Sequence, residues 1–288
     1  MSGAGTEVQV AGLRLRSPVL VAAGCGGTGR ELAAYAPLAD LGAFTTRTVT
    51  SDPRPGAPAG RVVESPSGLV HATGLPNPGL DHFLATELPG LVAQDVRVVV
   101  SLAVTSAADA SALARRLARA PGVSAVELAL APPGGHAEDP DEEDLFAALE
   151  PHQAAGMVGA VARELPPGLP VWAKVRNDPD RVVAVARACV DAGAGAVVVG
   201  DGLSAVLPDG RAGGLGGPAV RPVALACVRR VVAALPHVDV VGVGGVATPT
   251  DVRAFLDAGA RAVGVGTALL HDPTTAARLA AALREETR

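Results

Sequence analysis

Eight short apolar runs, most of them rich in valine, recur along the chain, and a segment with helical spacing follows each one. Such runs are typical of parallel strands that are buried on both faces, because the connecting helices cover the sheet. The runs are residues 19–23, 43–49, 96–104, 125–131, 170–175, 196–200, 238–243 and 262–265. This alternation predicts a (β/α)8 barrel with excursions after strands 2, 4 and 6.

The remaining segments complete this barrel. Residues 8–15 alternate around a turn and predict a hairpin that closes the bottom of the barrel. In the long excursion after strand 2, residues 62–64 and 69–72 are predicted to pair around Pro66-Ser67-Gly68. Helices are predicted at about 30–41, 80–91, 107–120, 150–164, 180–192, 222–235, 249–259 and 273–286. The length of 288 residues suits one domain spanning residues 1–288, of which residues 1–5 are expected to be disordered.

Composition excludes several classes of function. Hydrophobic residues make up 49% of the chain but aromatic residues only 2%, so the core must consist of valine, leucine and alanine. The net charge is −5 with both signs interspersed, and no basic stripe predicts nucleic-acid binding. No apolar run of about 18 residues and no signal pattern occurs, which favours a cytoplasmic protein without a membrane span. The three cysteines show no metal-binding or disulfide spacing, so no metal is expected.

The last two predicted strands each end in a glycine turn. Gly244-Gly245 follows strand 7, and Gly266-Thr267 follows strand 8 after one intervening helix. In (β/α)8 barrels the loops after strands 7 and 8 frequently bind phosphate, because glycine lets backbone N–H groups approach the ligand. Ordinary tight turns are the alternative, but two such turns one βα unit apart favour a phosphate site.

Lys174 is the only lysine among 24 basic residues, and it lies at the end of predicted strand 5. Lysine is a compact charge whose pKa responds to its surroundings, so it is not interchangeable with arginine. Chance is the alternative explanation, since a lysine at a strand end is usually just solvated. Chemistry in this fold occurs at the carboxyl ends of the strands, which makes Lys174 a candidate site residue.

Several sequence segments are similar to those of a known family, and this resemblance covers the chain from Val8 to about Leu283. They are LRSPVLVAAGCGGTG, RVVESPSGLVHATGLPNPG, AVELALA, VWAKV, GGLGGPAVRPVAL, VVGVGGVATPTDV and AVGVGTALLHDP. Together with the order of the excursions, they are similar to the dihydroorotate dehydrogenase family, in particular to the catalytic subunit of its class 1B type.

The resemblance implies an oxidoreductase of pyrimidine metabolism that uses an FMN cofactor and acts on a CH–CH bond. It implies that Lys174 faces the N1 side of the flavin, where its charge stabilises the reduced ring. It implies a homodimer that acts on a small-molecule substrate, with an iron–sulfur, FAD-bearing subunit as a further partner. The cofactor-binding residues that it implies are Ala22, Ala23, Arg47, Thr48, Lys174, Gly200, Gly217, Gly244, Gly245, Gly266 and Thr267.

The chain differs from this family at most of the positions that contact the substrate. Members of the family carry a cysteine base on the loop after strand 4, where this chain has Pro132. The asparagines beside that cysteine correspond to Ala129 and Gly134, and the asparagine after strand 3 to Ser101. A lysine corresponds to Arg47 and another asparagine to His71. The positions expected to meet the substrate are Arg47, His71, Asn77, Asp201 and Gly202.

These changes predict an FMN-dependent oxidoreductase that acts on a substrate other than dihydroorotate. His71 or His136 would supply acid–base chemistry near neutral pH, and Arg47 would clamp an anionic group or pair with Asp201. A buried polar ligand group without its partner costs roughly 1–3 kcal/mol, so orotate would bind weakly. One alternative is a genuine dihydroorotate dehydrogenase with an unorthodox base. Another is a non-catalytic relative that binds flavin or acts as a scaffold.

Overall fold

The computed structural model describes residues 6–130 and 150–287. Three sets of predictions therefore lie outside the described residues: the disorder of residues 1–5, the base position at Pro132 with its neighbour Gly134, and the acid–base role of His136.

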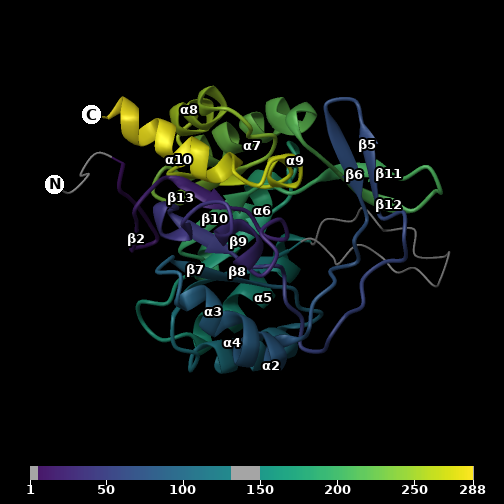
Figure 1. Ribbon diagram of the computed structural model, residues 1–288. Helices are drawn as coiled ribbons and strands as arrows, with labels where there is room; N and C mark the ends of the chain where they lie inside the picture. Colours follow the sequence, from purple (N-terminus) through teal and green to yellow (C-terminus); the bar gives the residue numbers. More distant parts are fainter. Residues whose placement is uncertain (1–5, 131–149, 288) are drawn as a thin grey trace.

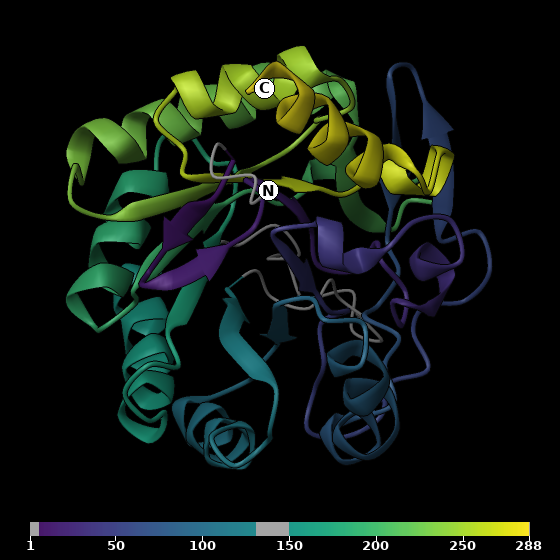
Figure 2. The same ribbon diagram turned by 60° about the vertical axis from the view of Figure 1, so that its left-hand side comes forward.

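The predicted barrel is confirmed. Eight parallel strands close on themselves, and each is joined to its neighbours in chain order (Figure 2). They are β3 (Val19–Val21), β4 (Ala43–Thr45), β7 (Val98–Leu102), β8 (Val123–Ala129), β9 (Val171–Val175), β10 (Ala196–Val199), β13 (Asp239–Val243) and β14 (Ala262–Val265). Each lies within or within two residues of the run that predicted it. The carboxyl ends of the strands therefore converge on one face.

Helices surround the barrel (Figure 1). They are α2 (Leu80–His82), η2 (Phe83–Glu87), α3 (Leu88–Val92), α4 (Ala107–Leu117), α5 (Pro151–Glu164), α6 (Val182–Asp191), α7 (Arg221–Ala234), α8 (Pro249–Asp257), α9 (Ala268–His271) and α10 (Thr275–Glu286). The helix predicted at 30–41 is wrong. It is split into α1 (Arg30–Ala33) and η1 (Leu38–Asp40), because Pro37 disfavours helical geometry at the residue before it. The prediction at 80–91 also missed the π-helical turn η2.

The amino-terminal hairpin closes the barrel bottom, as the alternation in residues 8–15 predicted. Strands β1 (Val8–Val10) and β2 (Leu13–Leu15) pair antiparallel. Val10 and Leu15 are fully buried against apolar residues that point into the barrel. These are Leu20, Ala43, Val99, Ala125, Trp172, Ala196, Val198, Val241 and Ala262. The lower interior is therefore apolar.

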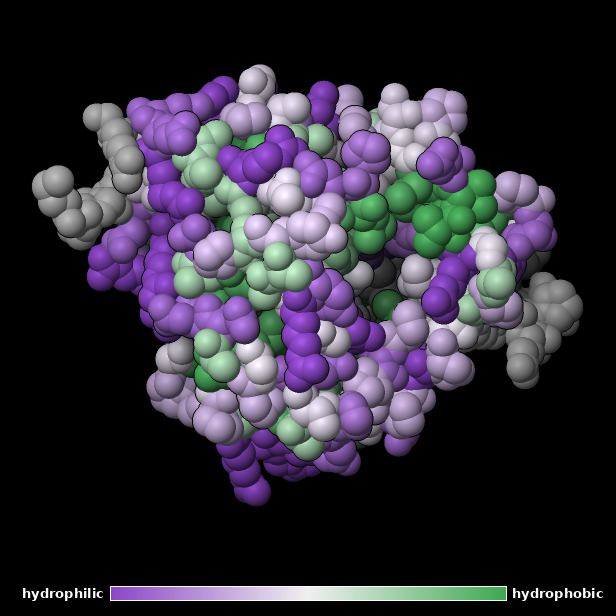
Figure 3. Space-filling view, in the orientation of Figure 1, coloured by the Kyte–Doolittle hydropathy of each residue, from purple (hydrophilic) through white to green (hydrophobic). Residues whose placement is uncertain are grey.

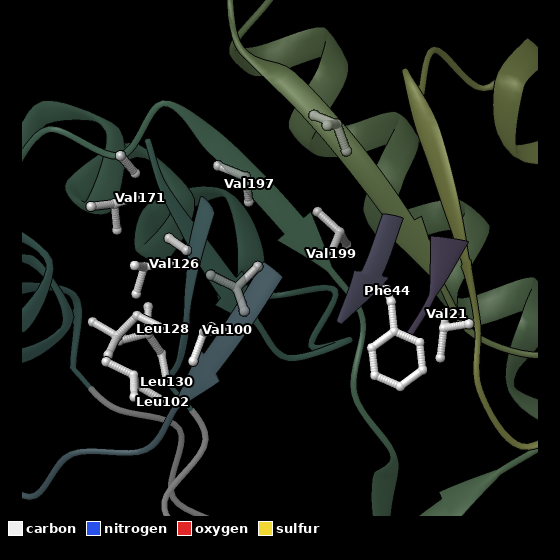
Figure 4. Packing of buried hydrophobic residues seen from close by; sticks show 14 of the residues in the cluster. Val21, Phe44, Val100, Leu102, Val126, Leu128, Leu130, Val171, Val197 and Val199 are labelled. Atoms are coloured by element: carbon white, nitrogen blue, oxygen red, sulfur yellow. The ribbon is translucent and has the colours of Figure 1, made fainter. Parts of the chain in front are cut away.

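The alternate residues of the same strands face outward and form the larger core. Val21, Phe44, Val100 and Val126 are fully buried there, as Figure 4 shows from close by. Successive side chains of a strand point to opposite faces, so Leu20 lies inside the barrel and Val21 lies under the helices. Valine and leucine make up most of both clusters, as the scarcity of aromatic residues predicted.

A second sheet stands beside the barrel and joins two excursions (Figure 1). It has the order β11 (Leu203–Val206), β12 (Ala212–Gly216), β6 (Gly68–His71) and β5 (Val62–Ser65), all antiparallel. The pairing of β5 with β6 confirms the predicted hairpin, whereas β11 and β12 were not predicted as strands. Gly214 of β12 pairs with His71 of β6, which brings the excursions after strands 2 and 6 together.

Candidate active site at the barrel mouth

A small cavity opens at the carboxyl ends of the barrel strands. Its lining combines apolar residues of the barrel interior with an acid, a hydroxyl and an amine. It is lined by Leu20, Val21, Ala22, Ala23, Thr45, Glu127, Trp172, Lys174, Val198, Val241, Val243 and Gly264. Of the predicted site residues, Ala22, Ala23 and Lys174 therefore share one cavity. On the side of the four-stranded sheet, the surface of the molecule is hollowed (Figure 3).

Glu127 is an acid of this cavity that the sequence analysis did not single out. It lies on β8 with only 3% of its surface exposed. The hydroxyl of Ser101 on β7 donates a hydrogen bond of 3.0 Å to Glu127 Oε1. Ser101 Oγ also lies 3.0 Å from Thr48 Oγ1. Burial raises the pKa of Glu127, while Lys174 and the Ser101 hydrogen bond oppose that rise.

Lys174 is the cation of the cavity. Burial alone would lower the pKa of its amine, but the carboxylates of Glu127 and Asp201 outweigh burial and raise that pKa. Lys174 is therefore charged at neutral pH. Among the described residues its amine forms no hydrogen bond and no ion pair within 4.0 Å, and the residue lines the cavity.

His71 lies at the edge of the same group of charges. A Cβ at Gly202 would lie 3.3 Å from its Nε2, and a Cβ at Gly214 would lie 3.2 Å from it. The imidazole therefore packs against two glycine backbones. Burial lowers the pKa of His71, with Asp201 opposing this shift and Lys174 adding to it. His71 is thus neutral at pH 7 and able to accept a proton.

Cys25 completes the group from the loop after β3. Its Sγ would lie 3.6 Å from a Cβ at Gly266, so the thiol borders the loop after strand 8. Burial raises its pKa to about 11; Lys174 opposes this rise and Asp201 adds to it. The thiol is therefore protonated and unreactive at neutral pH.

The glycine turns after strands 7 and 8, Gly244-Gly245 and Gly266-Thr267, form the glycine cradle, where the sequence predicts a phosphate site. Within the described residues, no backbone oxygen accepts a hydrogen bond from the N–H groups of Gly245, Gly266 or Thr267. Gly245 has φ +69°, and a Cβ there would lie 2.7 Å from the carbonyl oxygen of Gly217. The close approach of the two loops therefore requires glycine at 245. Backbone N–H groups left free at glycine turns of this kind are suited to bind phosphate.

Asp251 fastens the loop that carries Gly244 and Gly245, a role that the sequence analysis missed. It is the third residue of α8, and its side chain accepts hydrogen bonds from the backbone N–H groups of Ala247 (3.0 Å) and Thr248 (2.9 Å). Its other oxygen lies 2.7 Å from Nη1 of Arg221. Asp251 is only 6% exposed, so these bonds hold the turn from beneath.

Arg47 lies past the end of β4 and turns toward η2. Its Nε is 3.7 Å from Oε2 of Glu87, and it forms no ion pair with Asp201 among the described residues. The Nε is buried and has no hydrogen-bond partner in the part of the chain described. The suggested Arg47–Asp201 pair is therefore wrong for this structure.

Two asparagines hold loops rather than point freely into the cavity. The Asn77 amide accepts from Gly79 N–H (2.9 Å) and donates to the carbonyl oxygen of Leu75 (2.9 Å). A substrate contact by Asn77 would have to break one of these bonds. Asn177, which was not predicted, donates to the carbonyl oxygen of Asp201 (3.0 Å), while its own Oδ1 is buried without a partner among the described residues.

The other predicted glycine positions are also packed closely against neighbouring segments. A Cβ at Gly202 would lie 2.8 Å from the Cα of Gly214, and a Cβ at Gly217 would lie 2.6 Å from the Cα of Gly68. At Gly244 it would lie 2.7 Å from the Cβ of Ala224. A Cβ at Gly200 would likewise clash with Val243.

Two classes of feature are absent from the described part of the chain. Residues 6–130 and 150–287 contain no group of three or more His, Cys, Asp or Glu side chains able to hold a metal ion. None of the helices in these ranges is long and apolar enough to cross a membrane.

Comparison with known proteins shows which family combines these features. The family model for dihydroorotate dehydrogenase matches residues 6–286. The chain belongs to the dihydroorotate dehydrogenase family. Curated relatives named dihydroorotate dehydrogenase B (NAD(+)), catalytic subunit, are 39% identical in Desulforudis audaxviator and 35% identical in Geotalea daltonii. Each alignment covers 97% of this chain and 92% of the relative.

A solved structure agrees with the fold. A dihydroorotate dehydrogenase from Eimeria tenella in complex with ferulenol superposes with a TM-score of 0.75 at 18% identity. The match covers 96% of this chain and 83% of that protein. At this level of identity the likeness concerns the fold, the (β/α)8 barrel, and nothing finer.

FMN is the cofactor of this class of the family, and the residues present fit it. The free N–H groups of Gly245, Gly266 and Thr267 suit its phosphate. The charged amine of Lys174, which forms no hydrogen bond among the described residues, suits the electron-accepting end of the flavin, because negative charge gathers there on reduction. The glycine cradle and the Lys174 ammonium both lie at the carboxyl ends of barrel strands.

Proposed function

We propose that this chain catalyses an FMN-dependent oxidation or reduction of a CH–CH bond beside a carbonyl group. The observation that carries the proposal is the joint presence, at the carboxyl ends of the barrel strands, of the glycine cradle and of the charged Lys174, which forms no hydrogen bond among the described residues. FMN supplies the hydride acceptor when it is bound. The chain itself orients the cofactor, neutralises charge through Lys174, and must supply the group that moves the substrate proton.

Dihydroorotate is the first candidate substrate. The relatives at 35–39% identity are named dihydroorotate dehydrogenase B, and they align along nearly the whole chain. Their names favour this substrate more strongly than any residue pattern favours another compound. The position of the family's cysteine base is Pro132, so the reaction would be slowed by the loss of that base.

A different substrate is the second candidate, and the substrate-facing residues favour it. Asp201 stands where the resemblance implies an asparagine, and its carboxylate would repel the carboxylate of orotate. The same carboxylate would attract a cationic group, which dihydroorotate does not carry. This candidate predicts a substrate with a positive charge at this position.

The rate at which dihydroorotate reduces the bound flavin distinguishes the two candidate substrates. We expect anaerobic dihydroorotate to bleach the visible bands of the FMN-loaded protein roughly 10²–10⁴-fold more slowly than in a family member that carries the cysteine. The measurement is stopped-flow absorbance, with an inert dicarboxylate as the control. Flavin that stays oxidised over hours would favour the second candidate. A purified protein that takes up no FMN would instead favour the non-catalytic scaffold.

His71 is the proposed acid–base group among the described residues. Replacing His71 with glutamine, which keeps hydrogen-bonding capacity but not proton transfer, should lower the rate of flavin reduction roughly 10²-fold or more. With the unaltered residue the rate should fall as the pH drops below the ordinary histidine pKa of 6.5 and through the lowered value, because the neutral base is then lost. An unchanged rate in the variant, together with the same loss of rate at low pH as in the unaltered protein, would exclude His71 and direct attention to His136.

The expected partners follow from the same comparison. Class 1B catalytic subunits work with a separate electron-transfer subunit, and we propose that this chain, as a catalytic subunit, passes electrons from FMN to such a partner. A homodimer and a cytoplasmic location remain predictions. Co-purification and analytical ultracentrifugation of the native protein test the partner and the dimer.

A further inference from the structure

Lys174 and Glu127 project from neighbouring strands into the same cavity. In the register of β8 and β9, Glu127 pairs with Trp172 and Ala129 pairs with Lys174. Residues two apart on a strand point to the same face, so Trp172 and Lys174 share a face, and Glu127 lies diagonally below the lysine on that face. All three line the cavity.

The carboxylate of Glu127 is held in place, whereas the amine of Lys174 is not. Ser101 donates to Glu127, and Thr48 lies within hydrogen-bond distance of Ser101. These contacts come from β7 and from the segment after β4. Lys174 forms no hydrogen bond among the described residues, so its direction depends on the charges around it.

Few other titratable groups influence the lysine. Asp201 approaches from the segment after β10, and Cys25 from the loop after β3. His71 on β6 is affected by Lys174 in turn. Of these groups, Glu127 is the most deeply buried acid, and its attraction is therefore the least screened by solvent.

We propose that Glu127 is a positioning residue whose buried carboxylate keeps the Lys174 ammonium charged and directed into the cofactor cavity. Without it, burial would favour the neutral amine, and the lysine would lose the charge that the flavin site requires. The step to the flavin rests on the proposed function, whereas the coupling of the two side chains does not.

The directions of the two pKa shifts agree with this pairing. Among the groups that raise the pKa of Lys174 against burial, Glu127 is the largest. Burial is the main reason for the raised pKa of Glu127, and Lys174 is the strongest group opposing it. Between the two pKa values both side chains are ionised and attract each other.

The composition of the chain makes a direct test possible. Lys174 is the only lysine, so a ¹⁵N label on lysine Nζ reports on this one amine in the whole protein. Its titration is followed by NMR in the FMN-free full-length chain and in Glu127→Gln, which removes the charge but keeps the shape. Glu87→Gln is the matched control, because Glu87 contacts Arg47 and does not line the cavity.

We expect the unaltered lysine to remain protonated up to and beyond its ordinary pKa of 10.5. In Glu127→Gln the titration midpoint should fall by at least about one pH unit, a tenfold change in the ionisation constant. Glu87→Gln should leave the midpoint unchanged. A midpoint in Glu127→Gln equal to that of the control would overturn the proposal.

Two further measurements keep the test decisive. Trp172, the only tryptophan, reports by its fluorescence whether each variant keeps its barrel interior. Should Glu127→Gln fail to fold, Ser101→Ala keeps the carboxylate but removes its donor, and the lysine midpoint should then fall by a smaller amount. An unchanged midpoint in folded Ser101→Ala would count against the proposal.

The FMN-loaded protein then shows whether the coupling matters to the cofactor. In Glu127→Gln, the rate of flavin reduction should decline as the pH rises through the lysine midpoint found by NMR. In the unaltered protein and in Glu127→Asp, the rate should stay constant over that pH range. A flat profile in Glu127→Gln despite a shifted lysine would refute the link to the flavin. A chain that takes up no FMN refutes the proposed function instead, and the NMR result stands separately.

Discussion

Replacing Lys174 with methionine is expected to lower the rate of flavin reduction roughly 10²–10³-fold, the usual cost of losing one preorganised group that stabilises developing charge. The same change leaves the buried Glu127 without its cation. Lys174 and Glu127 form no ion pair within 4.0 Å among the described residues, and Lys174 keeps part of its surface accessible, so we expect a loss of roughly 1–3 kcal/mol, the cost of a buried polar group left without compensation. Stopped-flow absorbance measures the first effect and urea unfolding the second.

The double variant Lys174→Met with Glu127→Gln separates the two effects. It removes both charges, so the free energy of unfolding should return to within about 1 kcal/mol of the unaltered protein. The rate of flavin reduction should stay low, because the ammonium is still missing. Equal destabilisation in the single and double variants would show that the two side chains are not coupled.

Replacing Gly245 with alanine is expected to lower FMN affinity at least tenfold, which corresponds to about 1.4 kcal/mol. The residue has φ +69°, and its new Cβ would lie 2.7 Å from the carbonyl oxygen of Gly217 and 2.9 Å from the Cβ of Arg221. One of the atoms that this Cβ would clash with belongs to the backbone, so the turn itself must move. The N–H groups of the cradle would move with it. Quenching of Trp172 fluorescence by added FMN gives the affinity.

Gly168→Ala is the matched control for this experiment. Gly168 has φ +90° but no atom within 4 Å of a Cβ, and it lies between α5 and β9, away from the cradle. Gly168→Ala should lower the free energy of unfolding by only about 1–2 kcal/mol, the cost of the backbone strain, and should leave the FMN affinity unchanged. If Gly245→Ala behaved in the same way as this control, the cradle would not be the phosphate site.

The barrel was predictable because its signal is local. Each strand is a short apolar run followed by a segment with helical spacing, and burial on both faces leaves that pattern in the sequence without knowledge of any contact. The same holds for the glycine turns after strands 7 and 8 and for the single lysine. Glu127 also left a signal, since it is a charge inside the apolar run from Ala125 to Leu128.

The sequence by itself therefore determined the architecture, the glycine turns and the identity of the lone ammonium. Only the tertiary structure decided which groups meet at the mouth. His71 and Gly214 are far apart in the chain and meet because β6 pairs with β12. Arg47 turns toward Glu87, and Glu127 toward the lysine cavity. Local patterns encode the periodicity of burial, whereas the direction of a charged side chain depends on neighbours that only the closed barrel supplies.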